Sequence, residues 1–261
     1  MLHDSLSSDQ VVDAEAALEF MKEASTLATT AELEDIGQRL EMKSAVFSAL
    51  LAPDAIDDLD EAAFKRLSGL IFTVRRKASR LIKANGLDVL RRELKALLYG
   101  DKPVAERLDT FMGAIGGLEE AMILSLATET LHFSDPSRYW LWTHWIWNPK
   151  AAVSPGADSK RSGALALVTQ DDLELTPGTH GEVYEQVGRA TAAINKQGHV
   201  AGYSRSGRGL FGTDVFLACV YAVYMYTVFR IKLSQEFNRI LPELPELVQR
   251  VLGVQHLGET A

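Results

Sequence analysis

The 261-residue chain contains a single cysteine, Cys219, and this scarcity excludes several classes of site. One thiol cannot form a disulfide within the chain, and it cannot supply the ligands of an iron–sulfur cluster or of a cysteine-based metal site. Cys219 lies in an apolar stretch without an adjacent base, so we expect an inert core thiol. The lack of a disulfide framework favours a reducing, cytoplasmic location.

Long hydrophobic runs are also missing. The longest uncharged run, residues 215–229, has fifteen residues, whereas a membrane-spanning helix needs about 18 or more. We therefore expect a buried central helix and no membrane span. The residues after Met1 lack the basic region and apolar core of a secretory signal, so no secretory targeting is expected.

The motifs for catalysis and cofactor binding are incomplete. Glu129 and His132 have the spacing of half a di-iron carboxylate site, but the sequence has no second Glu-x-x-His pair. Gly207, Gly209 and Gly212 match the dinucleotide fingerprint, but no β-α-β pattern surrounds them. We therefore expect no catalytic residue, metal site or cofactor, which favours an interaction protein over an enzyme.

Helical periodicity runs through most of the chain and predicts a mainly α, multi-helix, bundle-like fold. Capping boxes at 29–32 and 179–182 and a capping aspartate, Asp60, mark three helix starts. Helical regions at 1–147 and 182–261 are expected to pack as one domain, joined by a long irregular loop at 148–181. The expected helices cover residues 9–27, 29–52, 60–85, 88–99, 103–115, 118–132, 179–197, 214–241 and 246–252.

Local periodicity predicts two further features, a β-hairpin and the apolar anchors of the first helix. Residues 164–168 and 172–176 each alternate with period two around a polar turn, which predicts a small β-hairpin inside the long loop. The first helix has weaker apolar anchors, for which Val12, Leu18 and Met21 are the candidates.

Charge is distributed unevenly along the chain. Residues 1–61 carry fifteen acidic and three basic side chains, whereas residues 62–95 carry ten basic and two acidic ones. In one interpretation, these segments are solvated helix faces or pack against each other. In the other, the basic helix 62–95, with Arg76 and Arg80 on one flank, docks on an acidic protein or a nucleic acid. A protein partner is favoured over nucleic acid, because the net charge of −8 repels phosphate at long range.

All four tryptophans, Trp140, Trp142, Trp145 and Trp147, lie within eight residues that also include His144. They form either a core cluster or an aromatic recognition surface. In a helix Trp142 and Trp145 would face together, opposite the other two, and a strand would break this grouping. Either geometry makes two faces aromatic, so we expect at least one or two rings to be partly exposed or to meet a second packing layer.

A second group of candidate residues follows the loop. The glycine-rich connection 198–214 carries Arg205 and Arg208, which could clamp an anion or a partner's carboxylate. Tyr221 and Tyr224 lie in the most apolar helix, where buried phenols need hydrogen-bond partners and could line a polar cavity or an interface.

Three strings in the second half of the chain carry a family resemblance: Asp135-Pro-Ser-Arg-Tyr-Trp-Leu-Trp142, residues 212–221, and Gln235-Glu-Phe-Asn238. They resemble uncharacterised helical proteins associated with sulfur-oxidising heterodisulfide-reductase-like systems. The resemblance implies a cytoplasmic accessory component with redox-complex subunits as partners, and it implies no cofactor or catalytic residue.

Three functions remain open on this evidence. The favoured one is a non-catalytic cytoplasmic interaction protein whose recognition surface is formed by residues 139–147 and 198–214. The second is an enzyme or a small-anion-binding protein with an aromatic pocket. The third is nucleic-acid binding through residues 62–95. Self-association into a homo-oligomer is a further open expectation.

Overall fold

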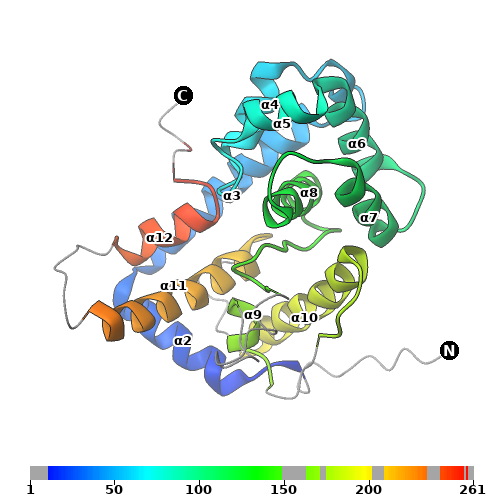
Figure 1. Ribbon diagram of the computed structural model, residues 1–261. Coiled ribbons are helices and arrows are strands. Elements are labelled where there is room, and N and C mark those ends of the chain that lie inside the picture. The colour runs from blue at the N-terminus through cyan, green and yellow to red at the C-terminus, as the bar shows by residue number, and fades with distance from the viewer. Residues whose placement is uncertain are drawn as a thin grey trace. The chain divides into compact units, whose positions relative to one another are not determined.

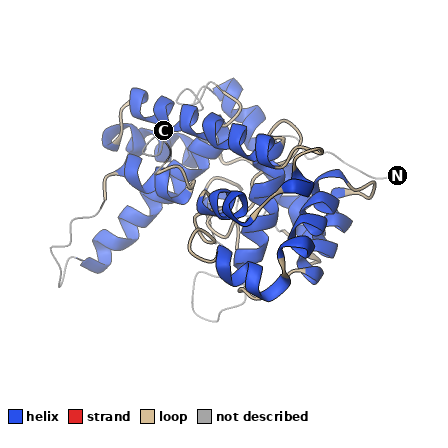
Figure 2. Cartoon of the chain, turned by 90° about the horizontal axis from the view of Figure 1, so that it is seen from above, coloured by secondary structure: helices blue, strands red, loops and turns tan. Residues whose placement is uncertain are grey.

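A computed structural model describes residues 11–148, 163–170, 175–201, 209–233, 242–255 and 257. Figure 2 shows that this part of the chain consists of helices and loops and holds no strand, which confirms the predicted mainly α fold class. One isolated antiparallel bridge joins Val12 to Thr169. None of the helices in the described ranges combines the length and the apolarity that crossing a bilayer requires.

The helices vary in length from a single turn to six turns. In chain order they are α2 (Ala14–Leu27), α3 (Thr30–Leu50), the 3-10 helix η1 (Ile56–Asp58), α4 (Glu61–Gly69), α5 (Ala78–Asn85), α6 (Leu87–Tyr99), α7 (Val104–Ala114), α8 (Glu120–Ser134), α9 (Ala164–Leu167), α10 (His180–Ala201), α11 (Gly212–Leu233) and α12 (Leu244–Val251) (Figure 1).

These elements belong to two compact units, and the chain passes between the units several times. The first unit comprises Met1–Gln38, Trp145–Glu174 and Ala190–Gln255. The second unit comprises Arg39–His144, Leu175–Arg189 and His256–Ala261. The tryptophan segment is therefore divided, with Trp140 and Trp142 in the second unit and the other two tryptophans in the first.

Helix α11 forms the centre of the first unit, where it packs against α2, α9 and α12. Figure 1 shows α11 between α2 and α12. Its many apolar residues are spread around the helix and do not gather on one face, which is typical of a helix that is covered by several neighbours. Helix α2 buries Ala17, Met21 and Ala24, whereas Leu18 is 49% exposed, so the predicted anchor role of Leu18 is wrong. The small Ala17 and Ala24 side chains form the contact face and turn Leu18 toward solvent.

Helix α8 has the corresponding place in the second unit, where it packs against α6 and α7. All residues from Ile123 to Phe133 are buried, including polar ones. A helix that is buried on every side must satisfy its polar side chains within the protein. This requirement determines the polar contacts described below.

Both predicted capping boxes are confirmed. The Glu32 carboxylate accepts a hydrogen bond from the Thr29 backbone N–H at 2.7 Å, and the Thr29 hydroxyl accepts one from the Glu32 N–H at 3.3 Å. Thr179 and Glu182 repeat this pattern at 2.9 and 3.3 Å. The backbone hydrogen bond from Thr29, with the bond from its hydroxyl, lowers the pKa of Glu32. Asp60 caps α4 as predicted, because its carboxylate accepts from the Ala63 N–H at 2.7 Å.

The continuous helix predicted for residues 60–85 is wrong, because α4 ends at Gly69 and α5 begins at Ala78. Tight turns connect them, with N–H groups bonding three residues back, as from Val74 to the Ile71 carbonyl at 2.9 Å. Gly69 and the β-branched residues after it have low helix propensity, which weakens the helix there. The predicted apolar positions are nevertheless buried: Phe64, Leu67, Ile71, Val74, Ala78 and Leu81.

The first strand of the predicted hairpin is also wrong, because residues Ala164–Leu167 form the short helix α9. Alanine and leucine are strong helix formers, and their propensity outweighs the period-two alternation. The greater part of the predicted long loop lies outside the described residues, as does most of the second predicted strand.

Candidate functional site

The tryptophan segment is neither a helix nor a strand. Its backbone is irregular from Tyr139 to Thr143 and turns at 144–146. Both groupings predicted for a regular segment therefore fail. Trp142 and Trp145 are buried, with 1% and 9% of their surface exposed, while Trp140 and Trp147 are half-buried. The expectation of partly exposed rings is confirmed for the latter two.

Distant groups satisfy the backbone of this segment, which explains its irregular path. In the second unit, the Tyr184 hydroxyl donates to the Trp140 carbonyl at 3.0 Å, and the Thr128 hydroxyl donates to the Trp142 carbonyl. In the first unit, the Ala164 N–H donates to the Trp145 carbonyl at 2.8 Å. Buried carbonyl groups need partners, and here tertiary contacts replace those of a local helix or sheet.

In the second unit, Trp140 and Trp142 both lie against the start of α10. The Trp142 ring is 6.4 Å from that of Tyr184 between centroids. A Cβ atom on Gly188 would lie 3.2 Å from Cδ1 of Trp140, so the glycine leaves room for the indole. Burial raises the pKa of Tyr184, which keeps its hydroxyl protonated as a donor. These contacts make Trp142 and Trp140 packing residues of this unit.

In the first unit, Trp145 packs on Tyr221, one of the two candidate tyrosines of α11. Its ring centroid is 6.0 Å from that of Tyr221, with 45° between the ring planes. Tyr224 lies one turn further along the same face of the helix and is 38% exposed. Burial and the nearby phenol of Tyr224 raise the pKa of Tyr221. Trp145, Tyr221 and Tyr224 thus form a graded series from buried to exposed, which we call the aromatic face.

The other sequence-predicted residues do not join the aromatic face. Arg76 and Arg80 are exposed residues of the second unit, in the turns before α5 and in α5 itself. His144 is half-buried and also belongs to the second unit. Arg205 and Arg208 lie outside the described residues.

The most unusual polar contact of the second unit was not predicted from the sequence. The Lys43 ammonium group donates to the Glu129 carboxylate at 2.7 Å and lies 4.0 Å from the centre of the Phe133 ring. Both charged side chains are buried. Burial raises the pKa of Glu129, and the charges of Lys43 and His132 oppose this rise. A signal was present, since Lys43 shares the helical spacing of the apolar residues Leu40 and Phe47.

A second buried cation holds the start of the tryptophan segment. Arg107 of α7 is 6% exposed and donates to the Leu97 carbonyl of α6 and, at 3.0 Å, to the Tyr139 hydroxyl. The Tyr139 carbonyl bonds with Nδ1 of His132 at 2.8 Å. Glu129 and His132, which have the spacing of half a di-iron carboxylate site, therefore contact different groups: Glu129 binds Lys43, and His132 bonds with the Tyr139 carbonyl. No group of three or more His, Cys, Asp or Glu side chains that could hold a metal ion occurs in the described ranges.

Comparison of the chain with protein-family models, with curated proteins and with solved structures finds no match.

Proposed function

We propose that this protein is a non-catalytic interaction protein that binds a protein partner through the aromatic face of its first unit. One observation supports this proposal above all others. Tyr224 is 38% exposed beside Tyr221, whose ring packs on that of Trp145. Tyrosine and tryptophan are enriched at protein interfaces, because their rings bury much area at little cost in conformational entropy.

The packing of the aromatic face also suits this role. Trp145 is held by a backbone hydrogen bond from Ala164 and by its ring contact with Tyr221. A partner would therefore meet side chains that are already ordered, so less entropy would be lost on binding. The resemblance of residues 135–142 and 212–221 to accessory proteins of sulfur-oxidising systems favours redox-complex subunits as partners. We also propose that the protein is located in the cytoplasm.

The test is affinity capture from the native cell with the tagged full chain and with the Tyr224→Ala variant. Tyr99→Ala is the control, because Tyr99 is a similarly exposed tyrosine, at 44%, in the second unit. We expect a co-purifying protein to be retained by the wild type and by Tyr99→Ala and lost from Tyr224→Ala. Equal retention by all three proteins would overturn the proposal. Trp142→Ala is unsuitable, since a 1% exposed tryptophan would report on folding instead.

A further inference from the structure

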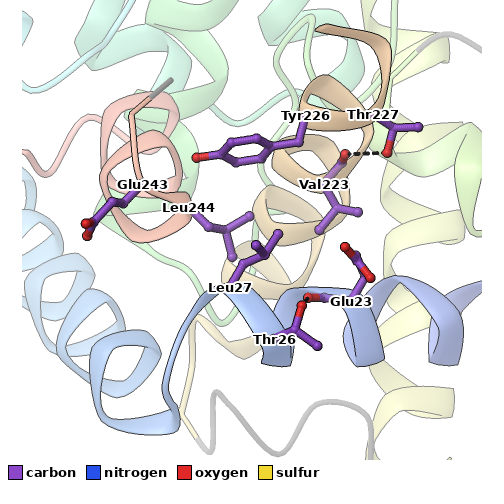
Figure 3. A pocket seen from close by; sticks show the side chains of 8 residues that line it. All are labelled: Glu23, Thr26, Leu27, Val223, Tyr226, Thr227, Glu243 and Leu244. Carbon is purple, nitrogen blue, oxygen red and sulfur yellow. Dashed lines mark hydrogen bonds between the residues drawn. The ribbon is translucent and has the colours of Figure 1, made fainter. Parts of the chain in front are cut away.

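The first unit contains an open cavity of about 520 Å³ between α2, α11 and the start of α12. This volume lies within the range of small-molecule sites, roughly 300–1,000 Å³. Figure 3 shows the eight side chains that line it: Glu23, Thr26, Leu27, Val223, Tyr226, Thr227, Glu243 and Leu244. On α11, Val223 and Tyr226 are rotated by about 200° and 140° from Tyr221, whereas Thr227 lies one turn beyond Tyr224, so the cavity includes neither tyrosine of the aromatic face but adjoins it at Thr227.

The lining places hydrocarbon between two carboxylates. In Figure 3, Glu23 and Glu243 lie on opposite sides of Leu27, Leu244 and the Tyr226 ring. Neither carboxylate has an ion-pair partner in the described part of the chain. Glu243 is the N-cap residue of α12, but its side chain makes no capping hydrogen bond. Both negative charges are therefore available to a ligand.

The lining carries no basic side chain, and the basic residue of α12 is engaged by another carboxylate. Arg250 of α12 donates to the Glu246 carboxylate at 3.0 Å. The eight lining residues include no lysine, arginine or histidine. Burial, together with the negative charges of Glu243 and Glu246, raises the pKa of Tyr226. Among the eight lining side chains, a cationic ligand would meet no competing positive charge.

The hydroxyl groups in the cavity already use their hydrogen atoms. The Thr26 hydroxyl donates to the Glu23 carbonyl at 2.7 Å, and the Thr227 hydroxyl donates to the Val223 carbonyl at 3.1 Å. The Tyr226 hydroxyl donates to the Pro242 carbonyl. The hydroxyl groups of the lining therefore offer a ligand only hydrogen-bond acceptors. An ammonium group has three donors and no acceptor, so its chemistry is complementary.

We propose that this cavity binds an aliphatic diamine or polyamine, whose ammonium groups meet Glu23 and Glu243 and whose methylene chain covers Leu27, Leu244 and the Tyr226 ring. The order cation, hydrocarbon, cation in such a ligand matches the order carboxylate, hydrocarbon, carboxylate in the cavity. This inference is independent of the proposed protein partner, because the cavity lining includes no residue of the aromatic face.

Equilibrium dialysis of the full chain tests the proposal with probes that share one hydrocarbon body. The probes are 1,6-diaminohexane, hexylamine, hexane-1,6-diol and spermidine. We expect the diamine and spermidine to bind several-fold more tightly than hexylamine, and the diol to bind most weakly, because each ammonium adds one carboxylate contact. Equal binding of the diamine and the diol would overturn the proposal. Displacement of the diamine by magnesium chloride at equal concentration would also overturn the proposal, because it would indicate a general attraction of cations.

Matched variants distinguish binding in the cavity from a general attraction of cations to the acidic chain. Glu23→Gln and Glu243→Gln each remove one charge from an exposed site and should weaken diamine binding by about fivefold. Their effect on hexylamine should be smaller than on the diamine. Glu19→Gln removes the same charge from an exposed site of α2 one turn earlier, outside the cavity, and should leave diamine binding unchanged. An equal loss in all three variants would overturn the proposal.

Discussion

The Lys43 ammonium group lies 2.7 Å from the Glu129 carboxylate, and the two side chains are only 0% and 5% exposed. The Phe133 ring covers the same ammonium group at 4.0 Å from its centroid. Water is thus replaced by a counter-charge and by the faces of the Phe133 ring and, at 5.8 Å, the Phe47 ring. Removing either partner would leave the other as a buried charge without its main compensation.

We predict a large destabilisation from Lys43→Met, of about 3–5 kcal/mol, because methionine fills the space but leaves the Glu129 carboxylate buried without its cation. Glu129→Leu should cost a similar amount. The double variant should cost much less than the sum of the two, since it buries no charge. Urea denaturation of the four proteins measures this coupling. Additive losses would show that the two residues act independently.

The raised pKa of Glu129 predicts the direction of a pH effect. Its folded-state pKa lies above the ordinary value of 4.5, chiefly because of burial, so the folded protein holds this proton more tightly than the unfolded chain does. The stabilisation from this residue is therefore complete below about pH 4.5 and is lost as the pH rises through the folded-state pKa.

Glu129→Gln isolates this effect, because glutamine resembles the protonated acid at every pH. The free energy of unfolding of the wild type, minus that of Glu129→Gln, should fall as the pH rises from about 4.5. Urea denaturation over a pH series measures the difference. A difference that rises with pH over the same range would contradict the prediction and would mean that Lys43 outweighs burial.

Local signals in the sequence were sufficient to predict the positions of most of the helices. The capping boxes of Thr29 and Thr179 and the cap of Asp60 are found as predicted, because each involves groups only three residues apart. The apolar spacing also identified the buried face at residues 64–81. It did not reveal the break between α4 and α5, since burial of the same stripe is compatible with a helix and with successive turns.

The path of the tryptophan segment could not be predicted from local sequence patterns. Its carbonyl groups bond with Tyr184, 44 residues beyond Trp140, and with Thr128, 14 residues before Trp142. No periodicity within residues 139–148 could indicate such partners. The aromatic face is a similar case, because Trp145 and Tyr221 were both candidates from the sequence but only the tertiary fold brings their rings together.

Two glycines with different surroundings give a paired stability prediction. Gly163 has a φ of +96°, and a Cβ atom there would lie 2.4 Å from the Ile146 carbonyl oxygen. Gly163→Ala should therefore cost at least about 2 kcal/mol through backbone strain and this clash. Gly37, inside α3, has nothing within 4 Å of its Cβ position, so Gly37→Ala should stabilise by about 0.5–1 kcal/mol. Thermal unfolding of both variants should give shifts of opposite sign, and a neutral Gly163→Ala would contradict the described turn.

The reactivity of Cys219 should report on unfolding. The side chain is 1% exposed in α11, and burial raises the pKa of its thiol to about 12. Only the thiolate attacks a disulfide reagent, so both low access and a low thiolate fraction slow the reaction in the native protein. We expect almost no reaction with Ellman's reagent at mildly alkaline pH, and rapid reaction of one thiol per chain in concentrated urea. Rapid native labelling would contradict the packing of α11 against α2 and α9, because the thiol could then be reached without unfolding.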